Sequence, residues 1–277
     1  MIDDLLSKFE QFCKVDRNLA PRTLSHNNGY LWQIRRCVQS IRKHPLQITE
    51  DDIRNYLTQF ETKSPHTKAN VLKALRVFFK HFLKMPEVVE SFKFPKKTYR
   101  PRAALTKLEL QKFYNALDCP RDRTLFLMFC STGLRRNEVL GLTIDQVNVG
   151  GRLVYPNSHE TGTTKKSWMG VFNTETQDHL REYLTIRRTN DKRLFPMSEV
   201  TLRRVFKEAS RSSTVKLTPQ DLRFWHSNAL ADAGIPDRFV DALQGRTPTS
   251  VLAKHYSDFA PERLKTIYDK ANLRVLD

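Results

Sequence analysis

An arginine near the start of a helix is the first feature of this sequence that could do chemistry. Thr218 and Pro219 indicate a helix start, because threonine can cap the first free amides and proline needs no amide partner. Gly234 ends the pattern. Arg223 therefore lies about one turn into the helix, near its positive end. We expect Arg223 either to bind an anion there or to be an ordinary surface arginine.

Two further segments carry arginines beside glycines. One spans Cys130–Leu142 and contains Arg135, and the other spans Leu243–Tyr256 and contains Arg246. A guanidinium suits phosphate because its planar fork donates to two oxygens at once and keeps its charge. In this order and at these separations, the three segments resemble the catalytic motifs of the tyrosine recombinase (phage integrase) family, over roughly residues 105–270.

The resemblance implies a role for each matching residue. Arg135 and Arg223 correspond to the two catalytic arginines of the family, and Glu138 corresponds to the acidic residue that orients the first. Arg246 stands where most members have histidine or tryptophan. Tyr256 follows ten residues later as the nucleophile, one residue beyond the spacing most common in bacterial members.

The sequence departs from the family pattern at two more places. Gln220 replaces the usual histidine; it can donate to a phosphate oxygen but cannot relay a proton at neutral pH. Glu160 occupies the position of the family's hairpin lysine, so the general acid falls to Lys165, with Lys166 as the alternative.

Integrases of archaeal viruses and plasmids (the fusellovirus type) carry an arginine like Arg246, and the sequence resembles that branch most. His226 aligns with an apolar family position, so we expect it to pack.

The activity that the resemblance implies is site-specific cutting and rejoining of double-stranded DNA through a 3′-phosphotyrosyl intermediate. It would need no metal, nucleotide or other cofactor, and it would be carried out by a homotetramer on two DNA sites. Integration or excision of a mobile element is the expected role. Alternatives are Xer-like resolution of chromosome or plasmid dimers, type IB topoisomerase-like activity, and a catalytically weak DNA-binding protein.

Charge and composition agree with a nucleic-acid partner. The 277 residues carry a net charge of +17 with a pI near 9.9, and the excess is spread along the chain. Ribosomal proteins and membrane-surface binders share this charge, so alone it only favours a polyanion. The four cysteines lack metal-ligand spacing, and no signal peptide or membrane span is recognisable. We expect a soluble, cytoplasmic, DNA-associated protein.

The fold class expected is mainly α with one small antiparallel β-sheet, in a two-domain recombinase architecture that clamps DNA. We expect a helical core-binding domain over residues 1–91, a basic linker over 92–104 and a catalytic domain over 105–277. Helical periodicity in the first domain predicts helices over Ile2–Val15, over Pro21 to about Arg42, from Thr49 and from Ser64. In the second domain we expect two strands within Val147–Tyr155, a third over Lys166–Phe172, and a helix over Pro248–Tyr256.

Basic side chains recur on one face of the helix that begins at Ser64. A solvated charged face is the ordinary explanation, but the run lacks acidic residues and suits a DNA backbone. The DNA-contacting residues predicted there are Lys68, Lys73, Arg76 and Lys80, and those predicted in the linker are Lys96, Lys97 and Arg100.

Overall fold

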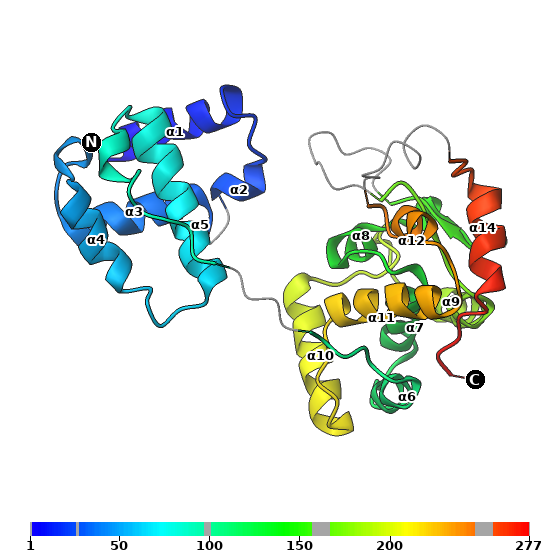
Figure 1. Ribbon diagram of the computed structural model, residues 1–277. Coiled ribbons are helices and arrows are strands. Elements are labelled where there is room, and N and C mark those ends of the chain that lie inside the picture. The colour runs from blue at the N-terminus through cyan, green and yellow to red at the C-terminus, as the bar shows by residue number, and fades with distance from the viewer. Residues whose placement is uncertain (1, 26–27, 97–100, 157–166, 247–256, 277) are drawn as a thin grey trace. The chain divides into compact units, whose positions relative to one another are not determined.

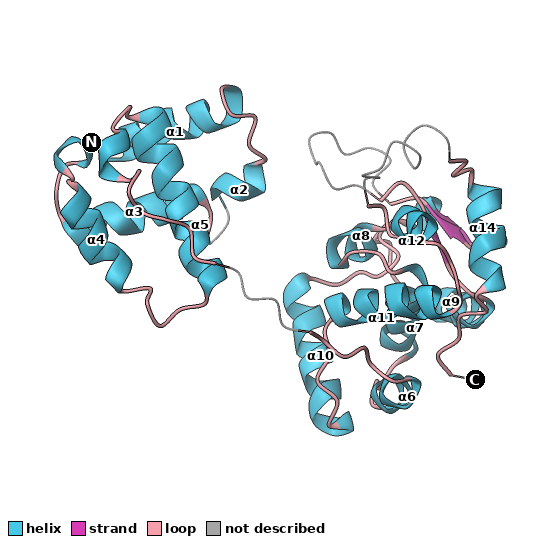
Figure 2. Ribbon diagram, viewed as in Figure 1, coloured by secondary structure: helices cyan, strands magenta, loops and turns pink. Residues whose placement is uncertain are grey.

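The computed structural model describes residues 2–25, 28–96, 101–156, 167–246 and 257–276. The chain divides into two compact units, Met1–Pro101 (unit 1) and Arg102–Asp277 (unit 2). Helices dominate both units, and the strands of the described residues all lie in unit 2 (Figures 1 and 2). The prediction of a mainly helical protein with one small antiparallel sheet is therefore confirmed.

Unit 1 is a helical bundle closed around aromatic side chains. The ring of Phe9 lies 5.0 Å from that of Phe78, edge to face, and Phe82 packs on both. Burying such rings supplies most of the free energy that holds a small helical unit together. Its elements are α1 (Ile2–Val15), α2 (Pro21–Ser25), α3 (Tyr30–Ile41), η1 (Pro45–Gln47), α4 (Glu50–Thr58), α5 (Pro65–Arg76), the π-helical turn η2 (Val77–Phe82) and η3 (Pro86–Val88).

The single helix predicted over Pro21–Arg42 is wrong. The structure has two helices, α2 and α3, and Gly29 precedes α3 in an extended conformation with φ −71° and ψ 174°. Asparagine and glycine both favour turns over helix interiors, since asparagine hydrogen-bonds nearby backbone and glycine loses most entropy in a helix. Asn28 and Gly29 therefore interrupt the helix although the apolar period continues through them.

The segment after η3 is fastened to α4 and α5 of unit 1. Arg76 donates to the carbonyl of Phe92 at 2.6 Å, and its guanidinium lies 4.5 Å from the centre of the Phe94 ring. Ser91 donates to Glu50 at 2.8 Å. The first residues of the expected linker thus belong, by their contacts, to unit 1.

Unit 2 is built around α7 (Pro120–Thr132). Ten of its residues are buried, Leu125 through Thr132 among them, and it packs against α9 and α11. A helix that is buried on all sides needs partners on all sides. The other helical elements of unit 2 are α6 (Lys107–Asn115), α8 (Arg136–Gly141), η4 (Ile144–Gln146), α9 (Thr174–Ile186), α10 (Glu199–Ser213), α11 (Pro219–Asp232), α12 (Asp237–Leu243) and α14 (Pro261–Lys270).

The sheet has the order β1-β2-β3 and is antiparallel throughout. Its strands are β1 (Val147–Asn148), β2 (Leu153–Val154) and β3 (Gly170–Val171). The third strand is shorter than the expected Lys166–Phe172, and Lys166 lies outside the described residues. Gly170 lies against Leu134, where an added Cβ would come within 3.4 Å of that side chain, so the sheet edge packs beside the start of α8.

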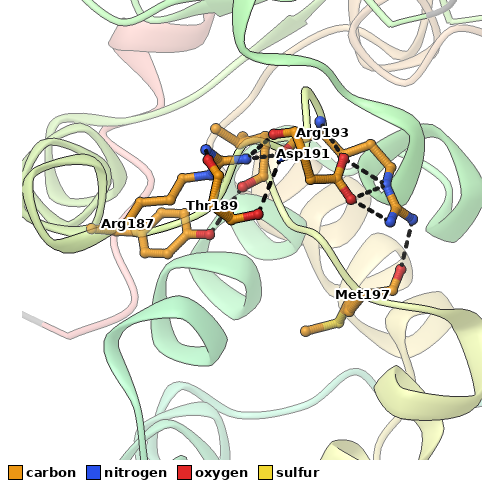
Figure 3. A network of polar contacts seen from close by, with 7 residues as sticks. Arg187, Thr189, Asp191, Arg193 and Met197 are labelled. Carbon is orange, nitrogen blue, oxygen red and sulfur yellow. Dashed lines mark hydrogen bonds and ion pairs between the residues drawn. The ribbon is translucent and has the colours of Figure 1, made fainter.

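An arginine–aspartate network shapes the loop between α9 and α10 (Figure 3). Arg193 donates to both carboxylate oxygens of Asp191 and to the carbonyl of Met197. Arg187 donates to three carbonyls of the same loop. The loop is also tied to the chain after α8, because Leu194 donates to the carbonyl of Leu142 at 2.7 Å. The network therefore supports the short helix α8 from its C-terminal side.

Substitution of Gly133 is expected to destabilise the fold more than substitution of Gly234. Both adopt left-handed φ angles, +59° and +77°, where alanine is strained by about 1 kcal/mol. At Gly133 an added Cβ would also lie 2.5 Å from the His226 ring, whereas at Gly234 it meets nothing within 4 Å. We predict that Gly133→Ala lowers the free energy of unfolding by roughly 3 kcal/mol and Gly234→Ala by about 1 kcal/mol, measured by urea unfolding. Equal losses would contradict the close contact with His226.

Candidate active site

Arg223 is a buried arginine held by backbone carbonyls. It lies on α11, whose first turn is capped by a reciprocal pair between Thr218 and Asp221. The side chain of Arg223 is 5% exposed and donates to the carbonyl of Gly133 at 2.6 Å and to that of Gln244 at 2.8 Å. Neither partner carries a charge, so the guanidinium is fixed in place but its charge is not neutralised by them.

Charged side chains of both signs lie near Arg223. Burial, together with the neighbouring charges of Arg135 and Arg246, lowers its pKa to about 10, against opposing contributions from Glu138 and Asp241. Arg135 and Arg246 are thus close enough to Arg223 to repel its charge. At neutral pH Arg223 still carries its charge, and a bound anion would relieve the repulsion.

Arg135 is oriented by Glu138, as expected from the sequence. It precedes α8, and its backbone amide donates to Glu138 Oε2 at 2.7 Å while its guanidinium donates to Oε1 at 2.9 Å. Glu138 is 4% exposed and also accepts from the backbone amide of Ser167 at 3.1 Å. The carboxylate therefore uses both oxygens, and Arg135 remains partly exposed with its other donors available for a ligand.

Ser167 and Gln244 connect the two arginines. The hydroxyl of Ser167 accepts from Arg135 at 3.3 Å and donates to the carbonyl of Gln244 at 3.2 Å, the same carbonyl that Arg223 contacts. Both side chains are fully buried. The pattern-based prediction missed both: Ser167 falls in a hairpin and Gln244 interrupts an apolar run, and only the second could have been noticed as a polar residue at a core position.

Arg246 follows a glycine whose position is set by close packing. Gly245 has φ +60°, and an added Cβ would lie 2.3 Å from the Cα of Ser167. Beyond it Arg246 is exposed and forms an ion pair with Asp241 at 2.8 Å. The turn after α12 thus brings Arg246 to the Ser167 side of the site while leaving its guanidinium open to solvent.

The remaining predicted site residues divide into two groups. Gln220 is described, and it lies exposed in the first turn of α11. Lys165, Lys166 and Tyr256 lie outside the described residues, as does the helix expected over Pro248–Tyr256. The structure therefore brings together Arg135, Glu138, Arg223 and Arg246.

Known families match both units. The model of the phage integrase family matches residues 103–263, and that described as the N-terminal SAM-like domain of phage integrases matches residues 5–87. The chain belongs to the phage integrase family. It is a tyrosine recombinase, an enzyme of the class that cuts and rejoins DNA at specific sites.

Individual relatives of this recombinase are distant. Tyrosine recombinase XerA of Saccharolobus solfataricus is 23% identical over 252 residues, covering 87% of this chain and 85% of the relative. Tyrosine recombinase XerA of Pyrococcus furiosus is 28% identical over 214 residues, covering 73% of each. A lambda integrase tetramer solved on a Holliday junction has a chain of similar fold, with a TM-score of 0.66 and 18% identity over 93% of this chain and 80% of that one.

His226 of the recombinase packs, as expected, but it is also part of the polar network. Its ring is fully buried and stacks on Tyr268, with ring centres 6.3 Å apart. Its Nδ1 lies 3.0 Å from the side-chain nitrogen of Gln244. Burial, together with the charge of Arg223, lowers the pKa of His226 to about 3, so the imidazole is neutral at physiological pH.

The basic residues predicted on unit 1 differ in their surroundings. Arg76 contacts Phe92 and Phe94, and Lys80 pairs with Glu90 at 2.5 Å. Lys73 and Lys96 are exposed, and Lys68 is partly exposed. Lys97 and Arg100 lie outside the described residues.

No helix among the described residues is long and apolar enough to cross a membrane.

The buried imidazole makes stability depend on pH. The pKa of His226 is about 3 in the folded chain and near 6.5 when unfolded, so between these values the unfolded state binds the extra proton and acid favours unfolding. We predict that, on going from about pH 7.5 to pH 5, wild type loses about 2 kcal/mol more unfolding free energy than His226→Leu. Urea titrations at both pH values measure this. Parallel losses in the two proteins would contradict a neutral, buried imidazole.

Proposed function

We propose that this recombinase integrates or excises a mobile element, using Tyr256 as nucleophile and Arg135, Arg223 and Arg246 as its phosphate-binding residues. The observation that carries the catalytic assignment is the buried guanidinium of Arg223, held by two neutral carbonyls and repelled by two neighbouring arginines. A buried charge without a charged partner is costly unless a ligand completes it. A DNA phosphate supplies the missing negative charge.

The chemistry is a transesterification. The hydroxyl of Tyr256 loses its proton to water as its oxygen attacks the phosphorus, a 3′-phosphotyrosyl bond forms, and the bond to the 5′-oxygen breaks. Lys165, or alternatively Lys166, gives the leaving oxygen its proton, and the arginines stabilise the charge that develops on the non-bridging oxygens. Gln220, exposed at the start of α11, donates to one of those oxygens. Attack by a 5′-hydroxyl of the partner duplex reverses the step and joins the exchanged strands.

The partner and assembly follow from the family. The lambda integrase of similar fold was solved as a tetramer on a Holliday junction. We propose that this chain likewise acts in the cytoplasm as a homotetramer on two double-stranded DNA sites. The core-binding domain (1–91) and the catalytic domain (105–277) would enclose the duplex from both sides, joined by the linker 92–104. The net charge of +17 supports such an enclosure.

Lysines on unit 1 are the proposed backbone contacts of the core-binding domain. Lys73 and Lys96 are exposed and Lys68 is partly so, which leaves their ammonium groups available to phosphates. Arg76 has a different task in the proposal, because its guanidinium holds the segment at Phe92 and Phe94. It sets the direction in which the linker leaves unit 1.

Resolution of chromosome or plasmid dimers is the second candidate, favoured by the names of the XerA relatives. The two roles differ in the sites that recombine. A mobile-element integrase joins the element's site to a chromosomal one, whereas a resolvase recombines two copies of one site. Plasmids that carry each pair, incubated with the protein, distinguish the roles by which pair yields products.

Replacing Tyr256 is expected to abolish the covalent intermediate. We predict that wild type forms an SDS-resistant adduct with plasmid carrying the element's own site, and that Tyr256→Phe forms none while still binding DNA. Tyr268→Phe is the matched control, because that hydroxyl is buried and donates to the carbonyl of Ser131. An adduct that persists in Tyr256→Phe would remove the nucleophile assignment.

Replacing Arg223 by lysine keeps the positive charge but removes the paired N–H donors of the guanidinium. We predict that Arg223→Lys lowers the single-turnover cleavage rate about a hundredfold, the usual effect of losing one oriented donor to a transition state, and changes DNA affinity little. Arg181→Lys, at an exposed arginine of α9 paired with Asp178, should leave the rate unchanged. A rate of Arg223→Lys within about twofold of wild type speaks against phosphate binding by Arg223.

Salt dependence separates the two kinds of basic residue on unit 1. Lys73→Gln should reduce the slope of log affinity against log salt by about one, because one phosphate contact and its counterion are lost. Arg76→Gln should leave that slope unchanged and instead lower the melting temperature of the protein, since it frees the Phe92 segment. Fluorescence anisotropy over a salt series gives both slopes, and an unchanged slope in Lys73→Gln excludes the lysine contact.

A further inference from the structure

Arg223 and Gln244 are bonded to each other in both directions. The guanidinium of Arg223 donates to the backbone carbonyl of Gln244 at 2.8 Å, and the side-chain amide of Gln244 donates to the backbone carbonyl of Arg223 at 2.9 Å. The side chain of each residue is thus held by the backbone of the other. The turn that follows α12 is thereby locked to the first turns of α11.

His226 sets the orientation of the Gln244 amide. The amide nitrogen of Gln244 lies 3.0 Å from His226 Nδ1, and its other hydrogen already goes to the Arg223 carbonyl. Since that nitrogen is the donor, Nδ1 must be the acceptor, which places the imidazole proton on Nε2. The ring itself cannot turn, because the Gly133 backbone approaches it closely on one side and Tyr268 stacks on it.

The locked turn determines where two arginines can reach. The Gln244 carbonyl accepts from Arg223 and from Ser167, and Ser167 in turn contacts Arg135. Arg246 lies only two residues after Gln244, and Gly245 between them packs directly on Ser167. The side-chain amide of Gln244 anchors this turn to the Arg223 carbonyl, so losing that anchor would free the backbone carbonyl that holds Arg223 and the residue from which Arg246 follows.

We propose that Gln244 is a positioning residue for the phosphate-binding arginines and that the Nδ1 acceptor of His226 holds it in place. This rests on the proposed function, in which Arg223 and Arg246 bind the scissile phosphate. The other explanation is that His226 merely fills space beside Tyr268. The two explanations predict opposite rankings for two substitutions of the same residue.

The test compares His226→Asn with His226→Leu. Both side chains branch at Cγ; leucine has about the volume of histidine, and asparagine is smaller. Asparagine offers an oxygen near the position of Nδ1, whereas leucine fills the space better and offers no acceptor. If the acceptor matters, asparagine retains most of the cleavage rate and leucine loses about tenfold, the factor that corresponds to one ordinary hydrogen bond. If only packing matters, leucine cleaves faster than asparagine, and the proposal is overturned.

Gln244→Leu supplies the matching half of a double-mutant cycle. Without the amide donor of Gln244, the acceptor at position 226 has no hydrogen-bond partner there. The advantage of asparagine over leucine should therefore vanish when each is combined with Gln244→Leu. An advantage that persists in the Gln244→Leu background shows that asparagine acts by another route and contradicts the proposed role of Gln244.

A second readout does not depend on cleavage. In protein labelled with ¹⁵N-arginine, the Nε–H signal of Arg223, assigned by its loss in Arg223→Lys, reports how firmly the guanidinium is held. We expect its hydrogen exchange to be slow in wild type and His226→Asn and at least tenfold faster in His226→Leu. Equal exchange in all three overturns the positioning role whether or not DNA is cut. The expected exchange pattern with no cleavage by wild type would sustain the positioning and refute the proposed function instead.

Discussion

A buried guanidinium that is bonded only to neutral carbonyls is the constraint on which the site depends. Arg223 is held by Gly133 and Gln244, which belong to the ends of two different helices, and its pKa is lowered to about 10, by burial first and by neighbouring arginines second. Such a charge would be better solvated in water, so the fold must supply the free energy that keeps it inside. The packing of α7 and α11 supplies it, and the unneutralised charge is what a phosphate can complete.

The rest of unit 2 brings loop ends to that guanidinium. Gly133 ends α7 in a left-handed conformation beside His226, Gly245 ends α12 in the same way beside Ser167, and Glu138 ties Ser167 to Arg135. Each glycine allows a backbone approach that any side chain would block. A mainly helical domain can therefore hold three arginines in one small region, although Arg135 and Arg246 follow the ends of α7 and α12 and Arg223 lies one turn into α11.

The sequence predicted the parts of the site that are set by local chemistry. Arg135, Glu138 and Arg223 could be placed because helix caps, glycine breaks and family motifs all mark them. Ser167 and Gln244 could not, since their importance arises from contacts across 77 residues of chain, which no local pattern reports. The break between α2 and α3 was missed for the opposite reason: the apolar period runs through Asn28 and Gly29, and backbone preference overrode it.

In the proposed reaction Arg223 stabilises the charge on the scissile phosphate, and a neutral substrate tests that role directly. Once the cleavage position is mapped from the covalent adduct, that phosphate can be replaced by an uncharged methylphosphonate. Cleavage by wild type and Arg223→Ala is then compared on both substrates. We predict that Arg223→Ala lowers the cleavage rate about a hundredfold or more on the phosphate substrate but only a few-fold on methylphosphonate. The reason is that methylphosphonate lacks the negative charge that Arg223 stabilises. An equal loss on both substrates would contradict the account, for it would mean that Arg223 supports the fold of the site rather than the phosphate.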